Sequence, residues 1–238
     1  MGAREGPTRT LLVLWDVDGT LVDTAGHGRH AFGEAFAAVF GREPVDGPVP
    51  MAGRTDHAIA LDLLECNAIE KGERHLPEMF EALHEALDGR RDAIAAEGRP
   101  QPGVPEALRA VAARDDVLQS LLTGNIERNA EIKLGAFGLE RHVDLEIGGY
   151  GSDHGTRSEL VGIARRKARE RRGADVPASH TVLVGDTPLD IEAAHSAGAR
   201  AVAVATGPYR LDELEQARPD AALADLRDTA ALMEALEG

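Results

Sequence analysis

The sequence has little cysteine and, near its N-terminus, only a short hydrophobic run. Cys66 is the single cysteine among 238 residues, which excludes an intramolecular disulfide and fits a reducing compartment. We expect Cys66 to be buried as a small apolar residue. The apolar run Leu11–Trp15 is too short for the hydrophobic part of a signal peptide or for a membrane span. These features predict a cytoplasmic protein.

The chain also lacks an excess of positive charge. Its formal net charge is -15 at pH 7. Nucleic acids and anionic membranes bind surfaces rich in lysine and arginine, so this composition argues against both as partners. An anionic substrate would have to be held by positive charge concentrated at one site.

Short apolar segments alternate with helical segments over most of the chain. The expected strands are Leu11–Trp15, Val117–Leu122, Val143–Ile147, Thr181–Val184, Ala201–Val204 and Ala221–Leu223. The expected helices among them are Val104–Arg114, Ile126–Phe137, Glu159–Arg172, Leu189–Ala197 and Leu211–Ala217. This alternation predicts an α/β fold with a doubly wound, Rossmann-like parallel sheet, in which ligands bind beyond the carboxyl ends of the strands.

Residues 24–97 have helical periodicity and no convincing strand. Apolar residues recur on one face between Ala31 and Phe40, Thr55 is a good N-cap for a second helix, and a third is expected over Pro77–Ala96. We therefore predict a helical cap domain, residues 24–97, inserted into a catalytic core formed by residues 1–23 and 98–238.

Two carboxylates follow the first expected strand. In an extended backbone, Asp16 and Asp18 point to the same side, and Gly19 lets the chain turn directly after them. Two acids this close repel each other, so the pair favours either a bound metal or a division into acid and base roles. The alternative is a solvated turn at the end of the strand.

Three other segments place reactive groups at strand or helix ends. The first is Thr123-Gly124-Asn125, which can present donors to a phosphoryl group but is equally a good helix N-cap. The second holds Asp186 and Asp190, which lie on one side of a first helical turn, where acids also complement the helix dipole. The third is a glycine-rich loop that ends at Arg157, which is otherwise a surface arginine.

Together these segments resemble the haloacid dehalogenase-like hydrolase superfamily, in its helical-cap, phosphoglycolate phosphatase-like branch. The four motifs occur in order: Asp16-Val17-Asp18-Gly19-Thr20, Thr123, Arg157, and Gly185-Asp186-Thr187-Pro188-Leu189-Asp190. The resemblance implies that Asp16 is the nucleophile that forms an aspartyl-phosphate and that Asp18 is the acid and base. It also implies that Mg²⁺ binds Asp16, the backbone carbonyl of Asp18 and Asp186, with Asp190 in support, and that Thr123 contacts the phosphoryl oxygens.

One motif departs from the family pattern. The family usually has lysine at the third motif, and the only lysines here are Lys71, Lys133 and Lys167, none of which precedes the expected helix. Arg157 is therefore the candidate, with a guanidinium that stays charged but is bulkier than an ammonium.

The cap is expected to determine specificity. Arg54 opens a cap helix and is a candidate for binding the anionic part of a substrate, together with Gly124 and Asn125 of the core. Arg54 is alternatively a surface arginine.

The favoured function is a Mg²⁺-dependent phosphatase that acts on a small phosphorylated metabolite. A phosphomutase would share Asp16 and Asp18, and so it stays open as the alternative. A non-catalytic binding module on the same fold is disfavoured because converging acids without a function only destabilise a protein.

Overall fold

The protein, represented by a computed structural model, is described over residues 10–45 and 49–238. Residues 1–9, which the sequence assigns to the core, lie outside the described residues. Six strands form one sheet in the order β5-β4-β1-β6-β7-β8, and every neighbouring pair is parallel. The strands are β1 (Leu11–Trp15), β4 (Val117–Thr123), β5 (Gly149–Tyr150), β6 (Thr181–Gly185), β7 (Arg200–Val204) and β8 (Ala221–Leu223).

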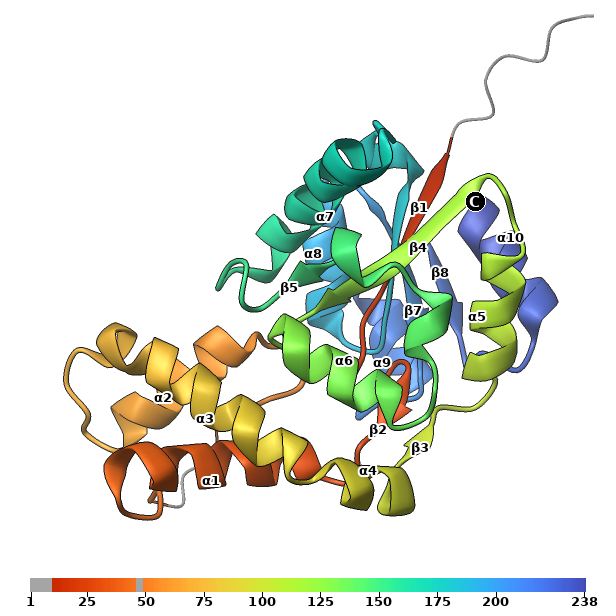
Figure 1. Cartoon of the computed structure of the whole chain (residues 1–238). Coiled ribbons are helices and arrows are strands. Elements are labelled where there is room, and N and C mark those ends of the chain that lie inside the picture. Colours follow the sequence, from red (N-terminus) through yellow and green to blue (C-terminus); the bar gives the residue numbers. More distant parts are fainter. Residues whose placement is uncertain (1–9, 46–48) are drawn as a thin grey trace, which may run out of the picture.

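Strand β1 lies between β4 and β6 because its residues are apolar on both faces. Val13 and Trp15 pack with helices α5 (Val104–Ala112), α6 (Glu127–Gly135) and α10 (Thr229–Glu237). Leu12 and Leu14 pack on the other face with α7 (Arg157–Arg172), α8 (Pro188–Ser196) and α9 (Leu211–Gln216) (Figure 1). The predicted doubly wound parallel sheet is thus confirmed, and the winding reverses at β1, where such folds bind ligands.

Four helices form a separate unit beside the carboxyl ends of the strands (Figure 1). They are α1 (His27–Phe40), α2 (Asp56–Cys66), α3 (Leu76–Asp88) and α4 (Arg91–Glu97), with a 3₁₀ turn η1 at Gly72–His75. Phe36, Leu64 and Met79 lie in their apolar cluster, which Ile132 of helix α6 also joins. Because this cluster is distinct from the two beside the sheet, the unit has its own core.

A two-stranded ribbon lies where the chain enters and leaves the helical unit. Strand β2 (Val22–Asp23) pairs antiparallel with β3 (Arg99–Pro100). Both strands lie at the predicted boundaries of the cap, so the ribbon brings the two crossings of the chain side by side.

Three local predictions are wrong. Val143–Ile147 is not a strand: 3₁₀ turns lie at Glu140–His142 (η2) and Leu145–Ile147 (η3), the second capped by Asp144, whose side chain accepts from the Glu146 N–H at 3.2 Å. The helix expected over Pro77–Ala96 is divided into α3, which ends before Gly89, and α4, which begins at Arg91. Cys66 is exposed rather than buried, since it is the last residue of α2 and the helix buries Leu64 instead.

None of the helices in the two described ranges is both long and apolar enough to cross a membrane. One further 3₁₀ turn, η4 (Ala178–His180), precedes β6.

Candidate active site

The end of β1 places two carboxylates beside β4 and β6. The backbone N–H of Asp16 donates to Val184 of β6 at 2.9 Å, while Val17 is buried in the core between the two acids. Gly19 then turns the chain with φ of +84°, and a Cβ at this position would lie 2.4 Å from Asp186 Oδ2. Only glycine therefore lets the turn after Asp18 approach the carboxylate that follows β6.

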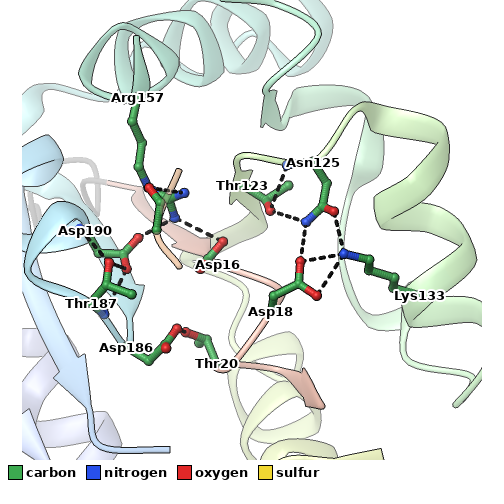
Figure 2. Close-up of polar contacts among 11 residues, drawn as sticks. Asp16, Asp18, Thr20, Thr123, Asn125, Lys133, Arg157, Asp186, Thr187 and Asp190 are labelled. Atoms are coloured by element: carbon green, nitrogen blue, oxygen red, sulfur yellow. Dashed lines mark hydrogen bonds and ion pairs between the residues drawn. The ribbon is translucent and has the colours of Figure 1, made fainter. Parts of the chain in front are cut away.

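Three buried carboxylates converge at this edge of the sheet (Figure 2). Asp16, Asp186 and Asp190 are 4%, 1% and 2% exposed, and one ligand oxygen from each lies within 4.8 Å of the others. Thr20 donates to Asp186 Oδ1 at 2.8 Å and fixes the orientation of that carboxylate. Asp16 is far from Asp186 and Asp190 in the sequence, and the parallel pairing of β1 with β6 brings it beside them.

Arg157, the first residue of α7, is the cation beside this cluster. Its guanidinium forms an ion pair with Asp16 Oδ1 at 3.0 Å and a second with Asp190, and it donates to the backbone carbonyl of Gly53 at 3.2 Å. Asp190 Oδ2 also accepts from the Thr187 backbone N–H and hydroxyl at the start of α8. Both oxygens of Asp190 are thus engaged, which leaves Asp16 and Asp186 as the better-placed ligands.

The electrostatics of the cluster favour a bound cation. Burial raises the pKa of Asp16 to about 6; Arg157 opposes this rise, and Asp190 and Asp18 add to it. Burial and the charges of Asp16 and Asp190 hold the pKa of Asp186 well above its usual range. Three carboxylates face one guanidinium, which leaves two negative charges when all are ionised. A hard divalent cation with oxygen ligands, such as Mg²⁺, fits both that charge and that donor set.

Asp18 lies in a second polar group on the other side of Asp16 (Figure 2). Lys133 Nζ lies 2.8 and 2.6 Å from its two oxygens, and Asn125 Nδ2 donates to Oδ2 at 2.7 Å. Asn125 also donates to Thr123 Oγ1 at 2.7 Å and accepts from Lys133 at 2.6 Å. The Thr123 hydroxyl thus accepts from Asn125 and keeps its own proton to donate, while Asp18 is held in one orientation.

Lys133 is the site residue that the sequence did not identify. Its side chain is 6% exposed, and it comes from the last turn of α6 rather than from the loop where the family pattern places a lysine. Asn129 and Lys133 are four residues apart on α6, which places them on one face of that helix, and Asn125 lies just before the helix begins. This spacing, together with the small number of lysines in the chain, is the signal from which Lys133 could have been predicted as a site residue.

The loop before α2 packs closely against the core. A Cβ on Gly124 would lie 2.0 Å from the carbonyl oxygen of Arg54, so glycine is required there by the approach of the cap. Arg54 lines the cavity between cap and core, but its guanidinium donates to Asp62 at 2.6 Å and to the Pro50 carbonyl at 3.1 Å. Its role in substrate binding, like that of Gly124 and Asn125, stays a prediction.

A doubly wound sheet whose strand ends gather carboxylates beneath a helical unit defines an enzyme with a capped active site. The model of one protein family, described as haloacid dehalogenase-like hydrolase, matches residues 13–195. The chain therefore belongs to this family of hydrolases, as the motifs indicate.

Two named relatives agree with this assignment, and one solved structure has the same fold. A Pseudomonas aeruginosa N-acetylmuramic acid 6-phosphate phosphatase is 29% identical over 84% of this chain and 83% of that protein. An Agrobacterium fabrum phosphoglycolate phosphatase is 27% identical over 94% of this chain and 93% of that protein. The fold matches CbbY from Rhodobacter sphaeroides, solved in complex with phosphate, with a TM-score of 0.67 and 23% identity, covering 94% of this chain and 99% of that one.

Proposed function

We propose that this hydrolase is a Mg²⁺-dependent phosphatase that cleaves a small phosphorylated metabolite through an aspartyl-phosphate on Asp16. One observation carries the proposal. The carboxylates of Asp16, Asp186 and Asp190 exceed the charge of Arg157 by two, and Asp16 lines a cavity together with Asp18 and Thr123. The phosphatases among its relatives support phosphate esters as the substrate class.

In the proposed reaction, a carboxylate oxygen of Asp16 attacks phosphorus and the bond to the leaving oxygen breaks. Asp18 gives a proton to that oxygen, and then takes one from the water that hydrolyses the acyl phosphate. Thr123 donates its hydroxyl to a phosphoryl oxygen, and Lys133 and Asn125 orient Asp18. Asp16, the Asp18 carbonyl and Asp186 would hold a bound Mg²⁺, with Asp190 in support. The charge of that ion would offset the negative charge of the phosphoryl oxygens.

The cap is assigned to residues 24–97 and the core to the remaining segments, with hinges near residues 23–26 and 98–103. Antiparallel pairing of β2 with β3 supports hinges there, since both crossings of the chain lie together. A cytoplasmic location stays a prediction.

The proposal is tested with the variants Asp16→Asn and Asp18→Asn. Asp16→Asn should form no covalent intermediate, because it lacks the attacking oxygen. With an activated ester whose leaving group needs no proton, Asp18→Asn should accumulate phosphorylated Asp16, which mass spectrometry of quenched enzyme detects. A phosphoryl group on another residue, or in Asp16→Asn, would refute the mechanism.

A screen of phosphorylated metabolites with and without Mg²⁺ separates the phosphatase from the alternatives. A phosphatase releases inorganic phosphate, whereas a phosphomutase converts one ester into an isomer without release. Absence of either reaction on every ester would favour a binding module.

A further inference from the structure

The cavity between cap and core is small and has walls of different character. Its volume is about 240 Å³, below the roughly 300–1,000 Å³ typical of sites for drug-sized ligands. Asp16, Asp18 and Thr123 lie on the core side. The cap contributes apolar side chains and a carboxylate, which come from Phe32, Ile59, Leu83, Leu87 and Asp56. The cavity suits a phosphoryl group joined to a leaving group of a few carbons.

Asp56 is the buried polar residue on the cap wall. It is 6% exposed and begins α2, whose N-terminus is capped by the Thr55 hydroxyl. Its backbone N–H donates to Gly124 at 2.7 Å, and its Oδ2 accepts from the Ile126 N–H at 2.9 Å. These two contacts with the core fix the position of the side chain while the cap is closed.

The other oxygen of Asp56 is available to a ligand. Within residues 10–45 and 49–238, no group donates a hydrogen bond to Oδ1 of Asp56. The protein does not fully enclose this oxygen, so a ligand can reach it. Since Asp56 lines the cavity, Oδ1 presents an acceptor to whatever occupies it. Burial raises the pKa of Asp56 to about 6, so this oxygen belongs to a carboxylate at neutral pH.

The buried cations around the cavity are already paired. Lys133 contacts Asp18, and Arg157 contacts Asp16 and Asp190. Arg54, on the cap loop, is paired with Asp62. A second anionic group on the substrate would therefore meet the carboxylate of Asp56 without a free buried cation to offset the repulsion.

Arg29 of the cap also lines the cavity, but it is exposed, so solvent screens its charge. The free oxygen of Asp56 therefore calls for a hydrogen-bond donor on the leaving group. A hydroxyl group supplies that donor without adding a second negative charge, and it can also accept from a cation or an amide. The carbon atoms that carry hydroxyls can pack on Phe32, Ile59 and Leu83.

We infer that the substrate is a monophosphate of a hydroxylated carbon chain without a second anionic group, of the polyol or sugar class, and that Asp56 accepts a hydrogen bond from one of its hydroxyls. This inference rests on the proposed phosphatase function and assigns the chemistry of the leaving group.

The test uses esters matched in size. One series is 2-hydroxyethyl phosphate, 2-phosphoglycolate and phosphoethanolamine, which end in a hydroxyl, a carboxylate and an ammonium. A second pair is glycerol 3-phosphate and 3-phosphoglycerate. With Mg²⁺, we expect kcat/KM for each hydroxyl ester to exceed that of its carboxylate counterpart by roughly tenfold or more, the size of one partly screened like-charge contact. Better turnover of phosphoethanolamine than of the hydroxyl ester would overturn the assignment of the donor as a hydroxyl.

The variant Asp56→Asn should lower the ratio of kcat/KM for the hydroxyl ester to kcat/KM for the carboxylate ester by about tenfold. The reason is that it removes the repelling charge and keeps an acceptor for the Ile126 N–H. Glu65→Gln is the matched control. It makes the same change on the same helix at an exposed position outside the cavity, so its ratios should equal those of the wild type.

Binding separates failure of this inference from failure of the phosphatase proposal. The same esters are titrated by calorimetry into Asp16→Asn in the presence of Mg²⁺. If no ester is hydrolysed but the hydroxyl esters bind best and Asp56→Asn removes that preference, the phosphatase proposal fails and the cavity assignment stands. The inference would be overturned if the carboxylate esters were turned over or bound as well as the hydroxyl esters, or better. It would also be overturned if Asp56→Asn left the ratio of kcat/KM between hydroxyl and carboxylate esters unchanged from the wild type.

Discussion

Replacement of Asp56 by asparagine should stabilise the protein at neutral and alkaline pH. Burial is the largest influence on this carboxyl and raises its pKa from an ordinary value of 3.8 to about 6, although Lys133 and the Ile126 N–H both lower it. At about 1.4 kcal/mol for each tenfold change in proton affinity, the buried charge costs about 3 kcal/mol in the folded state above pH 6. Asparagine carries no charge and its side-chain oxygen can still accept from Ile126.

The sign follows from proton binding. Between about pH 4 and pH 6 the folded protein holds the Asp56 proton more tightly than the unfolded chain does, so this group lowers the free energy of unfolding as pH rises through that window. Below about pH 4 the carboxyl is protonated in both states and the variant should match the wild type.

The assay is thermal or urea unfolding at pH 4 and pH 8 with a chelator present, so that bound metal does not contribute. At pH 8, about 3 kcal/mol corresponds to a rise in Tm of about 6–12 °C for a protein of this size. Glu65→Gln should show no comparable rise at either pH. If Asp56→Asn is less stable than the wild type at pH 8, the ionised carboxylate stabilises the fold and the reasoning fails.

The other predictions concern the metal, the lysine and the cap arginine. Asp186→Ala should abolish Mg²⁺-dependent turnover while circular dichroism shows an intact fold; near wild-type turnover with unchanged Mg²⁺ dependence would refute its role as a ligand. Lys133→Met should lower kcat on alkyl phosphates by on the order of tenfold to a hundredfold, with KM little changed and a smaller loss on an aryl phosphate, because it releases Asp18. A change in KM alone would assign Lys133 to substrate binding. Arg54→Ala should lower kcat/KM for the natural substrate more than for an aryl phosphate if Arg54 binds substrate; equal small losses on both would leave Arg54 as the partner of Asp62 alone.

The sequence predicted those parts of the site that strand ends determine. Asp16, Thr123 and Asp186 each follow an apolar run, and parallel strands bring their carboxyl ends to one edge of the sheet, so their proximity could be expected without coordinates. Arg157 was harder to identify because one arginine after a glycine-rich loop is common at surfaces. Its role could be suggested only by the order of the motifs.

The missed features depend on contacts between segments distant in the chain. Lys133 contacts Asp18 because α6 packs against β1, and the spacing of Asn129 and Lys133 indicates one helix face without showing which residue of the core that face contacts. The edge strand is only Gly149–Tyr150 and carries too few residues for a pattern. Cys66 was expected to be buried from its residue type alone, whereas its exposure depends on which face of α2 the cap covers.

Helix α6 limits how freely the cap could be exchanged between related enzymes. Ile132 belongs to the apolar cluster of the cap, while the next residue, Lys133, holds the acid of the core. A chimera that replaced residues 24–97 alone would place a foreign surface against Ile132 and could shift the neighbouring ammonium from Asp18. Grafts that carry α6 together with its cap would preserve both contacts. The segment that must be transferred to move specificity from one enzyme to another therefore includes α6 of the core as well as the inserted helices.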